Sequence, residues 1–170
     1  MRLKDYKQSV GRTKTDYCQK YLHKKSKLAA LLLIITISTG CGKSIYLVTG
    51  DFQPFIDNFS ALYKEPIADL IVEFGDTNYE ANRVIGTCYY GTVPRIVINS
   101  DFWERSSYYD KQVLLYHELG HCVLGRSHRD DLTVESRPLS IMNSFHIGQF
   151  WYTGYMDEYD SELMEGYKNE

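Results

Sequence analysis

The stretch from Tyr108 to Leu124 constrains the fold most, because it predicts one helix long enough to organise a small domain. Its apolar residues recur at the spacing of a single helix face. Gly125 follows directly and is typical of the position at which a helix ends. The apolar stripe comprises Val113, Leu114, Tyr116, Leu119, Val123 and Leu124. We therefore expect the rest of the domain to pack around this helix.

Shorter segments on both sides of this helix predict a mixed domain. Residues 52–65 have apolar residues at helical spacing and end before Pro66. Residues 67–74 predict a strand, and residues 84–90 and 95–99 predict two neighbouring strands joined by a turn that contains glycine and proline. Residues 126–155 show no clear period and are expected to be loop, whereas residues 157–168 predict a closing helix. The expected fold class is α+β, with one short mixed sheet.

The N-terminal segment predicts export and a lipid anchor. A basic stretch precedes the apolar run 28–37, which is shorter than the roughly 20 residues needed to span a bilayer. Small residues then lead to Cys41, and this resembles the lipobox of bacterial lipoproteins, in which the cysteine carries the lipid. We expect residues 1–40 to be an extension and signal peptide, 41–50 a tether, and 51–170 the folded domain. The alternative is a helix that is buried or lies on a membrane.

The charge distribution argues against nucleic acid as a partner. Residues 1–40 carry nine Lys or Arg and two acids, a net charge of +7, whereas the whole chain has a net charge of −3. Residues 41–170 therefore carry −10, which repels phosphate groups.

Two cysteines remain in the expected mature domain, Cys88 and Cys122, once Cys18 and Cys41 are assigned to the N-terminal segment. An even pair in an exported domain predicts a disulfide between them. Metal ligation by Cys122 is less favoured, because on a helix it points about 100° away from His121. Two unrelated buried thiols are the remaining alternative.

The predicted helix 108–124 also carries the residues that indicate chemistry. His117, Glu118 and His121 form a His-Glu-x-x-His pattern. On a helix the two histidines lie about 40° apart and one turn from each other, so both can reach one ion. Zinc suits two or three histidines with a water in the open position, and Glu118 beside it can act as general base. Two solvated histidines on an ordinary helix are the alternative.

The segment from His117 to His128 resembles the signature of the metzincin zinc peptidases, His-Glu-x-x-His-x-x-Gly-x-x-His. Gly125 and His128 match its second half, but three residues separate His121 from Gly125 where the family has two. An extra helical residue rotates the exit of the helix by about 100° and advances it by about 1.5 Å. The resemblance implies His128 as the third metal ligand. The alternatives that remain are Asp130, Asp131, Glu158 and Glu162.

Residues 140–143, Ser-Ile-Met-Asn, resemble the metzincin Met-turn, which implies that Met142 lies beneath the histidines as a structural residue. The family often has a tyrosine two residues later, where this chain has Ser144, so no tyrosine ligand is implied. Tyr152 and Tyr155 are candidates for helping an oxyanion by composition alone, and His146 is expected to pack or to lie at the surface. The resemblance also implies that a strand within residues 87–99 binds substrate as an added strand.

These patterns together predict a small zincin-like domain that hydrolyses peptide bonds with Zn²⁺ and Glu118. We expect a peptide or protein substrate, attachment to a membrane through a lipid anchor, and a location on the exported side. The alternative is a lipoprotein that binds metal without catalysis, or an assembly or adhesion factor on the same scaffold.

Overall fold

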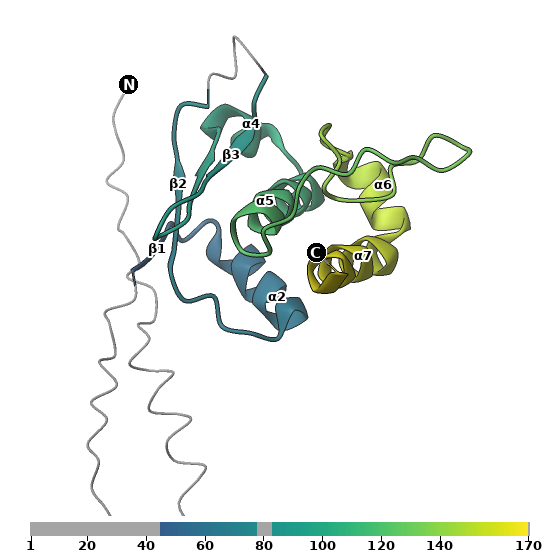
Figure 1. Cartoon of the computed structure of the whole chain (residues 1–170). Helices are drawn as coiled ribbons and strands as arrows, with labels where there is room; N and C mark the ends of the chain where they lie inside the picture. The colour runs from purple at the N-terminus through teal and green to yellow at the C-terminus, as the bar shows by residue number, and fades with distance from the viewer. Residues whose placement is uncertain (1–44, 78–82, 170) are drawn as a thin grey trace, which may run out of the picture.

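The computed structural model describes residues 45–77 and 83–169 (Figure 1). The expected extension and signal peptide, residues 1–40, and the expected lipid attachment site, Cys41, lie outside the described residues. Within the described ranges, none of the helices has both the length and the apolar character that crossing a bilayer requires.

The fold is α+β, as the sequence predicts, and the described residues form five helices and one mixed four-stranded sheet. The strand order is β1-β2-β4-β3. β1 pairs in parallel with β2, β2 pairs in parallel with β4, and β3 pairs antiparallel with β4. The elements are β1 Tyr46–Val48, α2 Gln53–Tyr63, β2 Leu70–Phe74, β3 Gly86–Tyr89, β4 Arg95–Ile98, α4 Ser100–Arg105, α5 Tyr108–Cys122, α6 Gly148–Gly154 and α7 Met156–Asn169.

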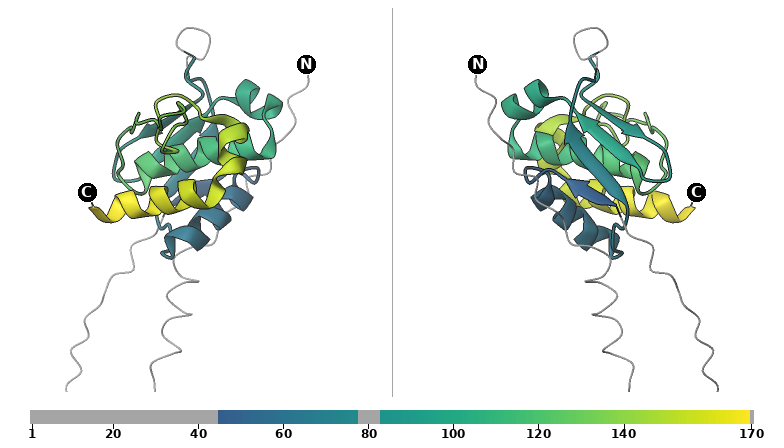
Figure 2. Two further views of the ribbon diagram at one scale, coloured as in Figure 1. Left: turned by 90° about the vertical axis from the view of Figure 1, so that its right-hand side faces the viewer. Right: turned by 90° about the vertical axis from the view of Figure 1, so that its left-hand side faces the viewer.

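The layers are a sheet and a group of helices that cover one of its faces. Figure 2 shows α2, α5, α6 and α7 on the same side of the sheet. The core lies between these layers and is filled by large side chains with almost no exposure, among them Phe52, Phe59, Leu70, Ile96, Ile98, Leu115, Tyr116 and Leu119. α5 packs against β3, β4, α2 and α6, so it is the central element that the sequence predicts.

Local signals account for the ends of the main helices. Ser107 caps α5, and its hydroxyl oxygen accepts a hydrogen bond from the backbone N–H of Asp110 at 3.1 Å. α2 has proline in its first turn and ends at Lys64, which adopts a left-handed conformation. The predicted helices 52–65, 108–124 and 157–168 are therefore confirmed, with ends shifted by a few residues.

Three parts of the chain differ from the sequence prediction. Residues 41–50, predicted as a tether, contain β1, because Tyr46–Val48 completes the edge of the sheet beside β2. Residues 126–155, predicted as loop, contain the seven-residue helix α6, which packs against α5 and α7. α4 was not predicted; Asn99 caps it through a hydrogen bond to Phe102, and Trp103 anchors it in the core. All three elements are too short to show a clear period.

Candidate metal centre

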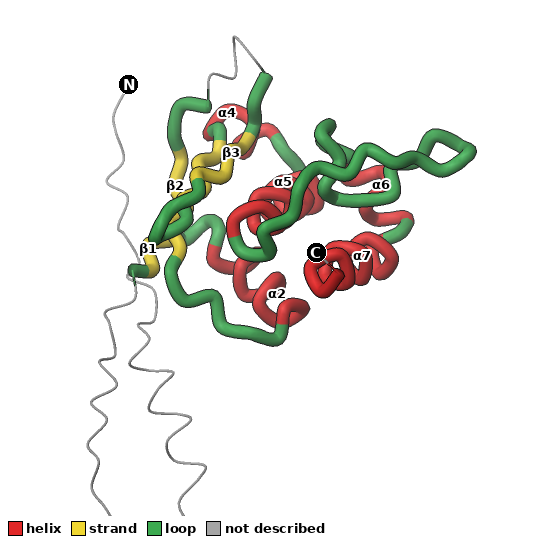
Figure 3. Tube along the Cα trace, viewed as in Figure 1, coloured by secondary structure: helices red, strands yellow, loops and turns green. Residues whose placement is uncertain are grey.

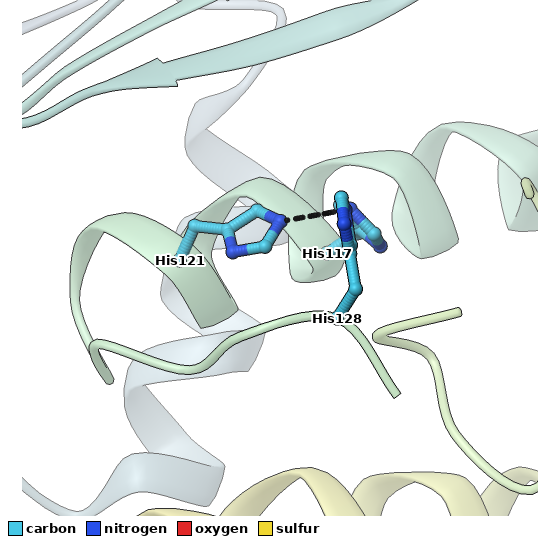
Figure 4. Close-up of side chains that lie close together, drawn as sticks. All are labelled: His117, His121 and His128. Atoms are coloured by element: carbon cyan, nitrogen blue, oxygen red, sulfur yellow. Dashed lines mark hydrogen bonds between the residues drawn. The ribbon is translucent and has the colours of Figure 1, made fainter. Parts of the chain in front are cut away.

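Three histidine side chains converge at the C-terminal end of α5. His117 and His121 lie one turn apart on α5, and His128 reaches them from the loop that follows (Figure 4). The Nε2 atoms are 3.1 Å apart between His117 and His121, 3.2 Å between His121 and His128, and 3.3 Å between His117 and His128. Among the described residues, these three form a cluster whose ligand atoms can hold one metal ion.

The other ring nitrogens of the two helix histidines are fixed by backbone carbonyls. His117 Nδ1 donates to the carbonyl of Ile141 at 2.8 Å, and His121 Nδ1 donates to the carbonyl of Arg126 at 2.6 Å. With the proton on Nδ1, each Nε2 presents a lone pair toward the centre of the cluster. Such outer hydrogen bonds set the tautomer and orientation of metal-binding histidines.

The geometry and charge state both fit a bound cation. Two lone pairs only 3.1 Å apart repel each other unless a positive ion lies between them. Imidazoles bound tetrahedrally to one ion at about 2.0–2.1 Å have nitrogens about 3.3 Å apart, close to the observed triangle. Burial lowers the pKa of His117 to about 4 and also lowers that of His121, so both are neutral as ligation requires.

The chain reaches His128 through a widened helix end. The N–H of Leu124 donates to the carbonyl of Leu119, five residues back, at 3.3 Å, and the N–H of Arg126 donates to Gly120, six residues back, at 2.9 Å. A regular α-helix bonds four residues back, so this last turn is wider and holds an additional residue. Gly125 then adopts φ +70°, a left-handed conformation that favours glycine. The turn therefore compensates for the long spacing between His121 and Gly125.

A turn at Ser140–Asn143 supports the histidines from below. The Ser140 hydroxyl accepts a hydrogen bond from the N–H of Met142 at 2.9 Å, and Met142 is fully buried. Gly120 of α5 packs directly on this methionine, since a Cβ there would lie 2.3 Å from its sulfur. The same turn supplies the carbonyl of Ile141 that holds His117. Met142 is therefore in contact with the helix beneath the site, and it is not among the clustered ligands.

Glu118 points from α5 toward β3 and is only 4% exposed. Its Oε2 has no hydrogen-bond partner among the described residues. A Cβ on Gly86 of β3 would lie 2.6 Å from its Oε1, so the absence of a side chain at Gly86 makes room for the carboxylate. Burial raises the pKa of Glu118 to about 8, and a backbone hydrogen bond from Cys88 opposes this only in part.

The histidines and Glu118 line a cleft of about 810 Å³. β3 and the residue after it form one wall, and residues 143–146 form the other; Figure 3 shows the long loop that supplies this second wall running from α5 to α6. Tyr90 and Phe145, which are 70% and 82% exposed, lie on the two walls. β3 is an edge strand of the sheet, so a backbone edge lies beside the cluster.

A disulfide joins Cys88 of β3 to Cys122 at the end of α5. It links the strand that faces Glu118 to the residue after His121. Cys122 is therefore not a metal ligand, and β3 and the end of α5 are held together covalently at this corner of the cleft.

The carboxylates considered as third ligands have other partners. Asp130 accepts hydrogen bonds from the backbone and hydroxyl of Ser144, and Asp131 pairs with Arg129. Glu158 pairs with Arg137, and Glu162 pairs with Arg126 and Arg129. None of the four belongs to the histidine cluster.

The two tyrosines suggested as oxyanion helpers do not line the cleft. Tyr152 is fully buried between Gln112 and Asp160, to both of which its hydroxyl is hydrogen-bonded. Tyr155 lies under the guanidinium of Arg137, 3.9 Å from the ring centre. His146, by contrast, does line the cleft, and its Nε2 lies 3.4 Å from Asp110.

Sequence reasoning did not single out Gly86 or Arg126, although both contribute to the site. A glycine inside a predicted strand is a recognisable signal that another group approaches the backbone closely. No local pattern marks Arg126, because its role depends on α7, which is distant in sequence.

No protein-family model, curated protein or solved structure matches this chain. The assignment of a metal centre therefore rests on the geometry of the three histidines and on the tautomers that their backbone partners fix.

Proposed function

We propose that this chain is a zinc-dependent peptidase of metzincin type. The observation that carries the proposal is a buried glutamate whose Oε2 has no partner among the described residues, beside three converging histidines, all on one cleft. Zinc suits three imidazoles with one open position, and when bound it lowers the pKa of a water and polarises the carbonyl under attack.

Glu118 would act as the general base. Its carboxylate is out of bulk water, and Oε2 is free, among the described residues, to accept a proton from the attacking water. Zinc beside it would favour the ionised carboxylate, so Glu118 could take up this proton and then deliver it to the leaving amine. A site that binds metal only for stability has no use for such a carboxylate.

The remaining features match what the metzincin resemblance implies. This chain has three residues between His121 and Gly125 where the family signature has two, and the widened turn before Gly125 accommodates the additional residue. The turn Ser140–Asn143 beneath α5 supports the resemblance to a Met-turn, and the edge strand β3, Gly86–Tyr89, overlaps the range 87–99 expected to bind substrate.

The substrate would be a peptide segment in extended conformation. Its backbone would add to the free edge of β3, which gives affinity through main-chain hydrogen bonds. With the lipid anchor expected at Cys41, the enzyme would act on the exported side of a membrane. A metal-binding lipoprotein without catalysis and an assembly or adhesion factor remain as outcomes of the test.

The deciding experiment measures zinc per chain and hydrolysis of a mixture of unstructured peptides, with wild type, His128→Ala and His146→Ala side by side. His146 is the matched control, because it lines the cleft but lies outside the cluster. We expect one zinc and hydrolysis in wild type and in the control, and loss of both in His128→Ala. One zinc without hydrolysis in wild type would favour a binding protein. A folded wild type without zinc would refute the metal site.

A further inference from the structure

One carboxylate outside the cleft bonds to both loops that support the histidines. Glu162 lies on α7, and its side chain is 16% exposed. Its Oε1 accepts hydrogen bonds from Arg126 at 2.6 Å and from Arg129 at 2.9 Å, and its Oε2 accepts one from the hydroxyl of Ser140 at 2.6 Å.

The first two partners belong to the loop that carries His128. Arg126 also supplies the backbone carbonyl that fixes His121 Nδ1. Arg129 follows His128 directly, and its backbone N–H donates to the carbonyl of Met142 at 2.8 Å. The two arginines therefore hold the chain on both sides of His128.

The third partner belongs to the turn beneath the helix. Ser140 precedes Ile141, whose carbonyl fixes His117 Nδ1. Glu162 is thus connected to each histidine through one or two residues: Arg126 for His121, Arg129 for His128, and Ser140 with Ile141 for His117.

The positively charged guanidinium of Arg126 is buried, and removing a charge from water is energetically unfavourable. The Arg126 side chain is 4% exposed, and its Nε has no hydrogen-bond partner among the described residues. Two backbone carbonyls of α7, at Glu162 and Leu163, accept from its Nη1. A guanidinium this deeply buried requires a paired carboxylate, and apolar residues would stabilise the docking of α7 equally well.

We propose that Glu162 is a positioning residue that preorganises the three histidines for metal by fixing both supporting loops. It does not touch the metal or the substrate. Without it, the loop 123–129 and the turn 140–143 lose their shared side-chain anchor, although the backbone hydrogen bond from Arg129 to Met142 remains, and the nitrogens converge less tightly before the ion arrives. The inference rests on the metal site of the proposed function and not on hydrolysis.

The test compares zinc affinity, measured by competition with a chromophoric chelator, for wild type, Glu162→Gln and Glu158→Gln. Glu158 is the matched control, because it lies on the same helix and pairs with an arginine, Arg137, but at 64% exposure and away from the site. Loss of a group that hydrogen-bonds a metal-binding histidine directly costs about 10–100-fold in metal affinity. Glu162 acts one step further out, so we expect a loss at the lower end of this range, about 10-fold, in Glu162→Gln and an unchanged affinity in Glu158→Gln.

The visible spectrum of the Co²⁺-substituted proteins provides a second measurement, one that a purely structural role would not change. At a temperature where both proteins are folded, Glu162→Gln should show altered ligand-field bands. Wild-type affinity and wild-type bands in Glu162→Gln would refute the proposal while leaving the zinc site intact. A wild type that binds neither metal would instead refute the proposed function.

A second variant covers the case in which Glu162→Gln does not fold. Arg129→Gln removes one partner of Glu162 at a side chain that is 42% exposed, so folding should be preserved. A several-fold loss of zinc affinity in this variant supports the proposal, and wild-type affinity contradicts it.

Discussion

The two glutamates on either side of the histidine cluster are buried in opposite ways. Glu118 faces β3 with one oxygen unpartnered among the described residues, and burial raises its pKa to about 8. Glu162 faces the supporting loops. Burial also acts to raise the pKa of Glu162. Hydrogen bonds from Arg126 and Ser140 outweigh this effect, so the pKa is lowered from its usual value of 4.5.

Under the proposed function, this difference separates a group kept for chemistry from a group kept for structure. A buried carboxylate oxygen without a partner destabilises the fold and remains only where another demand retains it. A carboxylate surrounded by donors fixes the geometry of those donors and is ionised at neutral pH. Under the proposed function, the cleft has a reactive wall at β3 and a rigid support at α7.

The largest effect is expected for Glu118→Gln. The amide keeps the shape of the side chain but cannot take a proton, so hydrolysis should fall by about 10³-fold. Zinc content should remain at the wild-type level, because Glu118 is not one of the clustered ligands. Peptide hydrolysis and metal analysis on the same sample measure both quantities. If this variant retained hydrolysis, Glu118 would not be the general base. The two buried glutamates would then not differ in having a catalytic and a structural role.

A smaller effect is expected for Gly86→Ala on the reactive wall. The new Cβ would lie 2.6 Å from Glu118 Oε1 and 2.9 Å from Leu114 Cδ1, so the carboxylate must shift. Displacement of a reacting group by about 1 Å can cost roughly 10²-fold, and we expect kcat to fall by about 10–100-fold with zinc retained.

The control for this variant is Gly154→Ala, where no atom lies within 4 Å of the added Cβ. It should keep wild-type kcat. Equal activity in the two alanine variants would show that β3 does not set the position of Glu118.

The smallest effect is expected on the free energy of unfolding of Glu162→Gln, on α7. Because the folded pKa of Glu162 is lowered, its contribution is present above the unfolded pKa of 4.5 and is lost as pH falls through the folded pKa. Glu162→Gln should therefore lower stability by roughly 2 kcal/mol at pH 7, below the value for fully buried pairs because the site is partly exposed.

Thermal unfolding of the metal-free proteins between pH 7 and pH 3 measures this dependence. The difference in Tm between wild type and variant should narrow as the pH falls below 4.5. A difference that is constant over this range would mean that the charge of Glu162 contributes nothing.

The long periodic segments were predictable because a single pattern covers many residues. The helices 52–65 and 108–124 carry an apolar stripe over several turns, and both are present. The helix 157–168, predicted from the acidic residues of its first turn, is also present. β1, α4 and α6 were not predictable, because their three, six and seven residues gain stability from packing on neighbours rather than from a pattern of their own.

The sequence by itself determined what depends on local geometry. The helical period places His117 and His121 on one face and Glu118 beside them, and Gly125 permits the left-handed turn that ends α5. The pairing of Cys88 with Cys122 followed from counting the cysteines in the predicted mature domain.

Only the tertiary structure decided which side chain completes the cluster and which carboxylate supports it. His128 and Glu162 were both candidates for the third ligand, and their distances along the chain did not separate them. The widened turn after α5 brings His128 to the other histidines, whereas the docking of α7 brings Glu162 to Arg126. The physical reason is that loop paths and helix docking depend on contacts between residues far apart in sequence, which no local period encodes.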